Sequence, residues 1–321
     1  DSARRVCTFM MNAGLFEQPY CEASVASAVF SSQVAADFAA EVNDRCVVML
    51  KNSGNAIAKD GMKGKPKVYI PQKYVAAVKG TFSTTPASIK ACFDESVASE
   101  YFDVVTDHVT ASEEPTEADV TRLSAEELAD VEYAVVKVRN PQDAFGGFEG
   151  GKIAFVGDTG IPLQWHPVSL QYRPYTADGP NVRKVSLAGD ILEDGTKQDR
   201  GHFGKSTHAT NESDLDLVLD VKSRLPEGCK LILVVDADRP MCFHEIEPSV
   251  DAIVFAFNKV SEEAYARVIS GTVEPSGLLS FQMPKDMDTV EAQLEDVPRD
   301  MDCYTDSEGN TYDFCFGLNW S

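Results

Sequence analysis

Residues 231–235 read Leu-Ile-Leu-Val-Val, and residues 252–257 read Ala-Ile-Val-Phe-Ala-Phe. Runs that are this short and this continuously apolar are typical of strands buried on both faces of a sheet. Four more strands are predicted from similar runs, at residues 46–50, 67–70, 102–105 and 133–138. Short apolar strands that alternate with helical segments predict an α/β domain with a mainly parallel sheet flanked by helices.

Helices are predicted where apolar residues recur every three or four positions. The segments with this spacing are residues 2–13, 32–45, 117–129, 213–225 and 261–269. On such sheets, ligands bind at the loops that follow the carboxyl ends of the strands. Asp236 and Asp238 follow one predicted strand, so they could touch a substrate, although helix capping or pairing with Arg239 is the simpler expectation.

One long stretch, residues 140–210, shows no helical pattern and forms a long irregular insertion. Loops of this length inside a compact domain tend to be functional. The stretch contains Trp165, Tyr172 and Tyr175, together with the neighbouring pair Asp199 and Arg200. Aromatic rings can cover the apolar face of a sugar, and carboxylates accept hydrogen bonds from its hydroxyls. The insertion is therefore a candidate sugar-binding rim, unless it is only an irregular excursion of the chain.

The composition narrows the class of ligand. Asp and Glu outnumber Lys and Arg by 51 to 29, which gives a formal net charge of −22. So acidic a surface disfavours nucleic-acid backbones and anionic membranes, and suits a neutral or cationic ligand. No apolar stretch approaches the roughly 18 residues that a membrane-spanning helix needs. We therefore expect neither a nucleic-acid partner nor a membrane partner.

The cysteines and histidines indicate neither disulfides nor a metal. The eight cysteines form no Cys-x-x-Cys pair, and several stand in apolar runs, where they act as small hydrophobic residues. This pattern predicts a reducing compartment, and hence a cytoplasmic location. The five histidines are scattered without zinc-ligand spacing, and the paired glycines lack a following Lys-Ser/Thr phosphate loop. We expect no metal and no cofactor.

Four blocks of sequence share one resemblance. Residues 4–20 end in Gly-Leu-Phe-Glu-Gln-Pro-Tyr, residues 46–52 read Cys-Val-Val-Met-Leu-Lys-Asn, and residues 271–284 contain Glu-Pro-Ser-Gly-Leu-Leu. Residues 306–320 end in Phe-Gly-Leu-Asn-Trp. In this order and spacing the blocks resemble glycoside hydrolase family 3, the β-glucosidase-type enzymes. The resemblance implies an (α/β)6-type sandwich over residues 45–321. It also implies that residues 1–44 are the last helix and linker of a preceding (α/β)8 barrel.

The resemblance also implies an activity, the retaining hydrolysis of a β-glucoside or oligosaccharide. Retention requires two carboxyl groups about 5 Å apart, one acting as nucleophile and one as general acid/base. In family 3 the nucleophilic Asp lies on the barrel, and this chain begins where the barrel ends. We therefore expect an incomplete catalyst that supplies the acid/base side and depends on a missing N-terminal barrel domain.

The acid/base residue is expected in the loop that follows residues 133–138. In many family members that loop reads Gly-Glu-Gly-x-Asp-Arg, whereas here residues 139–149 read Arg-Asn-Pro-Gln-Asp-Ala-Phe-Gly-Gly-Phe-Glu. Asp143 falls nearest to the expected catalytic position, and Glu149 is the alternative. Burial against a neighbouring Phe would raise the pKa of either acid. The candidate substrate-binding residues are Arg139, Trp165, Tyr172, Asp199 and Arg200.

Two other functions remain open at this stage. The chain could be a non-catalytic carbohydrate-binding module that uses Trp165, Tyr172 and Tyr175. It could also be an assembly module whose barrel is a separate polypeptide, docked through Val6, Phe9 and Met10 of the first predicted helix. Neither the sugar nor its linkage can be predicted, because the residues that would read them belong to the barrel.

Overall fold

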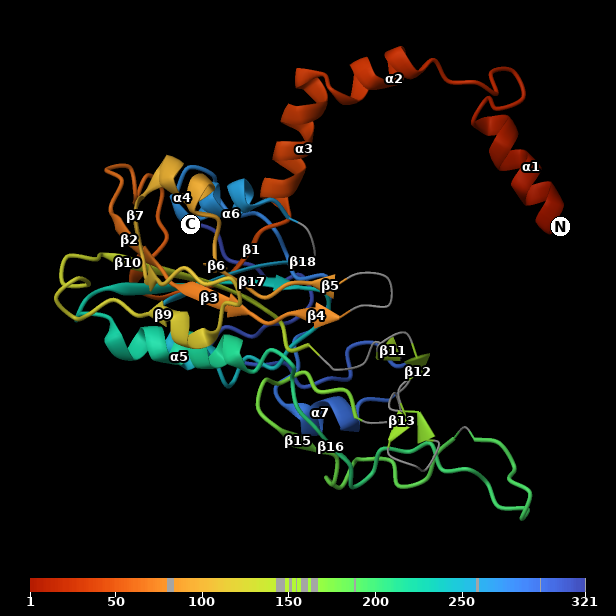
Figure 1. Cartoon of the computed structure of the whole chain (residues 1–321). Coiled ribbons are helices and arrows are strands. Elements are labelled where there is room, and N and C mark those ends of the chain that lie inside the picture. The colour runs from red at the N-terminus through yellow and green to blue at the C-terminus, as the bar shows by residue number, and fades with distance from the viewer. Residues whose placement is uncertain are drawn as a thin grey trace. The chain divides into compact units, whose positions relative to one another are not determined.

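Six strands form the central sheet, in the spatial order β1-β18-β17-β10-β2-β7 (Figure 1). They are β1 (Val48–Asn52), β2 (Lys67–Ile70), β7 (Asp103–Thr106), β10 (Tyr133–Arg139), β17 (Lys230–Ala237) and β18 (Ala252–Phe257). Each corresponds to one of the six predicted strands. Five of them run parallel, and β1 joins β18 antiparallel at one edge. The predicted mainly parallel sheet is confirmed.

The structure is a computed structural model. It describes residues 1–79, 84–142, 148–149, 152–153, 155–156, 161–162, 167–187, 189–257, 260–294 and 296–320. The chain divides into two units, residues 1–43 and residues 44–321. The first unit holds α1 (Ser2–Asn12), α2 (Ala23–Phe30) and most of α3 (Gln33–Arg45), and none of the side chains of these three helices is buried. The predicted helices at residues 2–13 and 32–45 match α1 and α3.

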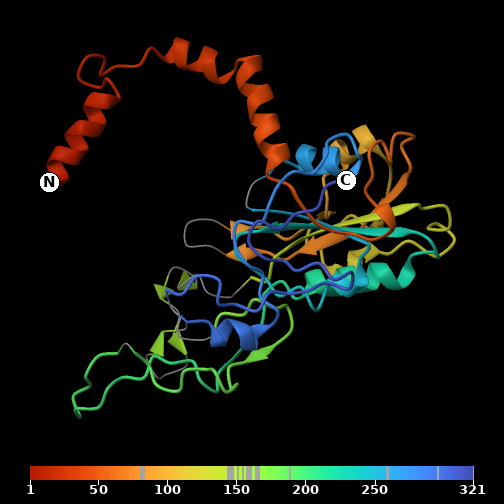
Figure 2. The same ribbon diagram turned by 180° about the vertical axis from the view of Figure 1, so that it is seen from behind.

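Helices cover both faces of the sheet (Figures 1 and 2). On one face, α5 (Ser213–Arg224) packs Leu215 and Val218 against Val136 of β10. On the other face, α4 (Glu95–Tyr101) and α6 (Glu262–Ile269) pack against strand residues such as Val234. Successive residues of a strand point to opposite faces, so each continuous apolar run contributes side chains to a hydrophobic core on both faces of the sheet. The result is a three-layer α/β/α sandwich.

Short hairpins and turns make up most of the remaining structure. The hairpins pair β3 (Gln72–Val75) with β6 (Ser88–Ala91), β4 (Val78–Lys79) with β5 (Thr84–Thr85), β8 (His108–Val109) with β9 (Val120–Thr121), β11 (Phe148–Glu149) with β12 (Lys152–Ile153), β13 (Phe155–Val156) with β14 (Ile161–Pro162), and β15 (Tyr175–Thr176) with β16 (Ser206–Thr207). A last helix, α7, spans Met287–Ala292, and 3-10 turns occur at Ser53–Asn55, Glu117–Asp119 and Glu247–Ser249.

The predicted helix at residues 117–129 is wrong. Only a single 3-10 turn forms there, followed by strand β9 and a series of turns. The reason is Asp107, a buried carboxylate that accepts hydrogen bonds from the Leu123 main-chain N–H at 3.1 Å and from Arg122 Nη1 at 2.5 Å. A main-chain donor that is bonded to a distant carboxylate cannot serve a helical ladder. Two local caps, Thr116 with Asp119 and Ser124 with Glu127, interrupt the segment further.

The insertion at residues 140–210 contains no α-helix among its described residues. Part of the insertion forms a small hydrophobic cluster of its own. In it, Tyr175, Ala177 and Val182 pack with Cys242, which follows β17, and with Met287 of α7. The eight cysteines all carry free thiols. Within the described ranges, no helix has the length and apolar character needed to cross a membrane.

The C-terminal segment covers the edge strand β1. The Leu318 N–H donates to the Met49 carbonyl at 2.8 Å, and the Gly277 N–H donates to the Val47 carbonyl at 3.1 Å. A Cβ atom at Gly277 would lie 2.6 Å from that carbonyl oxygen, so this close approach requires glycine. An edge strand covered in this way offers fewer open hydrogen-bonding groups to other chains.

Candidate functional site

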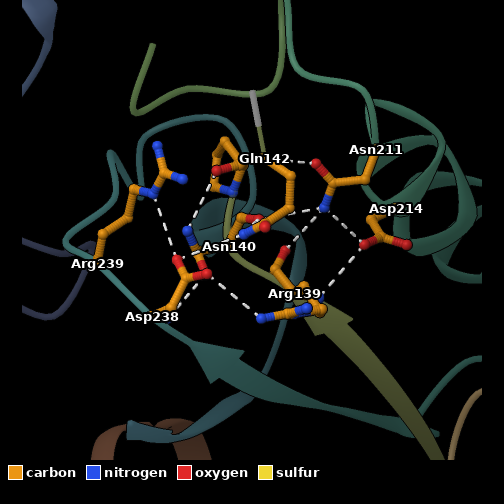
Figure 3. A network of polar contacts seen from close by, with 8 residues as sticks. Arg139, Asn140, Gln142, Asn211, Asp214, Asp238 and Arg239 are labelled. Carbon is orange, nitrogen blue, oxygen red and sulfur yellow. Dashed lines mark hydrogen bonds and ion pairs between the residues drawn. The ribbon is translucent and has the colours of Figure 1, made fainter. Parts of the chain in front are cut away.

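The candidate site lies where β10 ends and the insertion begins, at residues 139–142, called the β10 exit below. In the parallel pair of β10 with β17, Arg139 stands opposite Asp236, so the loops after both strands meet at one edge of the sheet. Figure 3 shows the polar side chains that gather there from β10, from the loop after β17 and from the start of α5. This is the edge at which the sequence predicted ligand contacts.

Asp238 is the acidic centre of this group. Arg139 Nη2 lies 3.4 Å and Arg239 Nε 3.3 Å from its carboxylate oxygens (Figure 3). Although burial raises it, hydrogen bonds from Asn140, Arg239 and Gln142 hold the pKa of Asp238 below its ordinary value. Asp238 is therefore ionised at neutral pH, with two guanidinium groups beside it. The predicted pairing of Asp238 with Arg239 is confirmed.

A second set of contacts fixes the main chain of the β10 exit from α5. Asp214, whose side chain is fully buried in the first turn of α5, accepts from the Arg139 N–H at 3.2 Å and from Asn211 Nδ2 at 2.9 Å. Asn211 Oδ1 in turn accepts from the Gln142 N–H at 2.7 Å. Lys73 Nζ supplies the counter-charge to Asp214. These contacts fix the path of the main chain at the start of the insertion (Figure 3).

Tyr172 also holds the β10 exit in place. Its ring is 0% exposed, and its hydroxyl donates to the Arg139 carbonyl at 2.5 Å. The Tyr172 N–H also donates to Glu245 at 2.6 Å. A ring without exposed surface cannot stack on a sugar, so the geometry gives Tyr172 a bracing function toward Arg139.

The other predicted site residues fall in different places. Asp199 accepts from the Gly201 N–H at 2.8 Å, and Arg200 pairs with Asp190 at 2.6 Å, so these contacts tie both residues to their own loop. Asp143 and Trp165 lie outside the described residues. Glu149 belongs to β11, of which the main chain is described and the side chain is not. The structure thus brings together Arg139 and Tyr172 but places Asp199 and Arg200 in another group.

Sequence reasoning missed part of the network. Asn140, Gln142 and Asn211 carry no recognisable motif, and the Asn211–Asn140 contact joins residues 71 positions apart. Asp214 had a sequence signal, as an acid in the first turn of a predicted helix, but its contact with the β10 exit had none. Within the described ranges, no three His, Cys, Asp or Glu side chains are grouped so as to hold a metal ion.

Comparison with known proteins finds a family match for the second half of the chain. Residues 170–320 match the family described as the glycosyl hydrolase family 3 C-terminal domain. The chain is similar to beta-glucosidase C of Emericella nidulans, with 33% identity over 99 residues that make up 31% of this chain and 15% of that protein. It is also similar to a probable beta-glucosidase C of Aspergillus oryzae, with 30% identity over 121 residues, 38% of this chain and 18% of that protein.

A solved structure agrees at the level of the fold. A beta-glucosidase involved in saponin metabolism from intestinal bacteria superposes with a TM-score of 0.50 at 14% sequence identity. The superposition covers 99% of this chain and 42% of that one, so the chain spans less than half the length of the solved relative. At this identity the likeness shows a shared α/β fold alone. The family match over residues 170–320 confirms the resemblance seen in the sequence: this part of the chain is similar to the C-terminal domain of glycosyl hydrolase family 3.

Proposed function

We propose that this chain supplies the general acid/base side, and part of the substrate pocket, of a retaining β-glucosidase-type glycosidase. Its partner would be an N-terminal barrel domain that carries the nucleophile. The observation that carries the proposal is the β10 exit. The family resemblance implies an acid/base residue just beyond this strand. Asp143 directly follows residues 139–142, whose main chain Asp214 and Asn211 hold, and Glu149 comes six residues after Asp143.

The two candidate acids would act in both steps of the reaction. In the first step the protonated carboxyl group donates its proton to the leaving oxygen while the nucleophile attacks the anomeric carbon. In the second step the same group, now a carboxylate, removes a proton from water. Asp143 is the first choice for this role and Glu149 is the alternative.

Arg139 is the substrate contact that the geometry supports best. Its side chain is 48% exposed while Asp238 holds the guanidinium group, so the remaining N–H donors are open to a sugar hydroxyl. Asp199, Arg200 and Trp165 remain proposed substrate contacts. A β-glucoside or an oligosaccharide is neutral, which agrees with a chain that carries a net charge of −22.

The alternative is a non-catalytic carbohydrate-binding or assembly module. Such a binding module would use Trp165, Tyr172 and Tyr175 as its stacking platform. Tyr172 and Tyr175 are only 0% and 8% exposed, so the geometry favours the catalytic proposal over this one. For assembly, the exposed Val6 and Phe9 of α1 offer apolar surface that a barrel could cover.

The acid assignment can be tested by joining this chain to the barrel of a family 3 β-glucosidase. Asp143→Ala, or Glu149→Ala if Glu149 is the acid, should slow the hydrolysis of glucosides with poor leaving groups by about 10²- to 10⁴-fold. Glucosides with good leaving groups should be affected far less, and added azide should restore their turnover. Asp194→Ala, an acid of the same insertion, is the control and should leave the rates unchanged. Full activity in both Asp143→Ala and Glu149→Ala would refute the proposal.

A further inference from the structure

A groove on the insertion is a second place suited to a ligand. It has a volume of about 560 Å³, within the range of pockets that enclose small molecules. One wall comes from the stretches 181–187 and 200–202 of the insertion, and the other from the end of α7 and the segment that follows it. Figure 1 shows α7 next to the β15–β16 hairpin of the insertion, against which it packs. None of residues 139–142 lines this groove, which we call the α7 groove.

Both walls of the α7 groove expose aliphatic side chains. Val185 and Leu187 on one wall are 72% and 73% exposed, and Leu294 and Val297 on the other are 61% and 43% exposed. Val290 also lines the groove and packs against the hydrophobic cluster of the insertion. Single exposed apolar residues are ordinary on a protein surface, but several that converge on one concave surface are typical of a binding site.

A carboxylate shares the groove with these apolar side chains. Glu291 of α7 lines the groove, and its side chain is 15% exposed, so a ligand can reach it. Glu291 Oε1 accepts a hydrogen bond from the Tyr175 hydroxyl at 2.9 Å and lies 3.2 Å from His202 Nε2. A carboxylate offers about four acceptor positions. Glu291 therefore has room for a further donor supplied by a ligand in the groove.

The charges in the wall favour a neutral ligand. Arg183 and Arg200 are positive and Glu291 and Asp296 are negative, so the wall as a whole selects neither an anion nor a cation. Asp190 already pairs with Arg200 at 2.6 Å.

The aliphatic walls disfavour a sugar. Most hydroxyls of a sugar would lose water against side chains that return no hydrogen bond, and among the described residues no aromatic ring lines the groove to cover a sugar face. An aryl or alkyl alcohol suits the groove better, because its apolar part covers the walls while its one hydroxyl donates to the carboxylate.

The extent of the groove favours a small molecule over a protein partner. Fourteen of the described residues line it. A stable protein interface uses about 20–30 residues on each side. The groove alone is therefore too small for a stable protein complex.

We propose that the α7 groove binds a neutral aryl or alkyl alcohol, whose hydroxyl donates to Glu291 and whose apolar part packs between the two aliphatic walls. Such an alcohol is not the glucoside of the proposed function, and its binding involves neither Asp143 nor Glu149. A failure to bind alcohols would leave the proposed function as it stands.

Methyl-resolved NMR of the full chain tests the proposal. Benzyl alcohol and n-hexanol should each shift the methyl resonances of Val185, Leu187, Leu294 and Val297 in a saturable manner. D-glucose, a free sugar, and benzoate, an anion with the same ring as benzyl alcohol, should not. The absence of saturable shifts with both alcohols would overturn the proposal, and so would equal shifts of the same methyl groups with D-glucose.

Glu291→Gln then isolates the contact to the hydroxyl. It should weaken the binding of benzyl alcohol about tenfold, because a charged acceptor is replaced by a neutral one. The affinity for toluene, which has the same ring without the hydroxyl, should not change. Equal affinity of the variant and the wild-type chain for benzyl alcohol would contradict the contact, and an equal loss of toluene binding would show that Glu291 acts on the shape of the groove instead.

Leu294→Ser keeps the test decisive if Glu291→Gln does not fold. Because Leu294 is exposed, the substitution should leave the fold intact, but it removes apolar wall and should weaken benzyl alcohol and toluene alike, by about fivefold. Leu278→Ser is the matched control, since Leu278 is 53% exposed and lies outside the groove. Unchanged affinity in Leu294→Ser, or an equal loss in Leu278→Ser, would contradict binding in the α7 groove.

Discussion

At the scale of single residues, the most demanding feature is a buried ion pair that ties β1 to the 3-10 turn at Glu247–Ser249. Lys51 Nζ lies 2.5 Å from Glu247 Oε1, and the two side chains are 5% and 1% exposed. Tyr304 and Ser307 donate to the same carboxylate at 2.8 and 2.7 Å. Burial raises the pKa of Glu247, but the hydrogen bonds from Lys51, Ser307 and Tyr304 outweigh it and hold the pKa below the ordinary value.

Glu247→Gln should lower the free energy of unfolding by about 3–5 kcal/mol at neutral pH, because it leaves the Lys51 ammonium group buried without its counter-charge. The pH dependence has a definite sign. A carboxyl group whose folded-state pKa is depressed stabilises the fold above its unfolded pKa of about 4.3, and this contribution is lost as the pH falls through the folded pKa. Urea unfolding between neutral and acidic pH measures both effects.

In Glu247→Gln, the free energy of unfolding should fall less on acidification than in the wild-type chain, because the contribution of the Glu247 carboxylate is already missing. Asp130→Asn, which removes the exposed partner of Lys67, is the control and should change stability far less. Equal stability of Glu247→Gln and the wild-type chain would show that the pair contributes nothing net.

At the scale of elements, the strands could be predicted because each is a short apolar run whose residues all find a buried face. The helix at residues 117–129 could not be judged from its spacing, since the group that prevents it, Asp107, comes ten or more residues earlier and acts through the fold. The short helix α4 was missed because seven residues give no clear periodicity. Its only local signal is the cap, in which Asp94 accepts from the Ser96 N–H.

The same limit applies to the candidate site. Arg139 and Asp238 could be identified because each follows a predicted strand. Asn211 could not, since an Asn in a loop acquires its function only when α5 packs beside β10. Tyr172 was assigned to the sugar because aromatic residues in an irregular loop suggest a rim, whereas its burial depends on packing that the sequence does not display.

Asn211→Ala tests whether Asn211 holds the main chain of the β10 exit in place. Loss of the acceptor for the Gln142 N–H should speed hydrogen exchange of that amide about tenfold, since a single hydrogen bond contributes about 1–1.5 kcal/mol. Exchange in the middle of β17 should be unaffected. Asn310→Ala, which removes an Asn contact to Asp306 in the C-terminal turn, should leave Gln142 unchanged. If Asn211→Ala leaves the exchange rate of the Gln142 amide unchanged, Asn211 does not hold the β10 exit in place.

At the scale of the whole molecule, the resembling blocks at residues 271–284 and 306–320 were sufficient to indicate the family, because both lie within the matched stretch 170–320. They were not sufficient for the chemistry. The loop after β10 departs from the family pattern in the very residues that would donate the proton, and the catalytic proposal therefore depends on position within the fold. The matched stretches make up 15% and 18% of the length of the two curated relatives, which leaves room in such proteins for a domain that supplies the second carboxyl group.

The central claim is that one half of a two-carboxyl catalyst resides on this chain. The most direct measurement is the release of phenol from an aryl β-glucoside by the purified chain alone. The proposal predicts no release above the uncatalysed rate, because it assigns the nucleophile to a barrel domain. Turnover by the pure chain, stopped by a mechanism-based inactivator that labels one of its own carboxylates, would contradict the account.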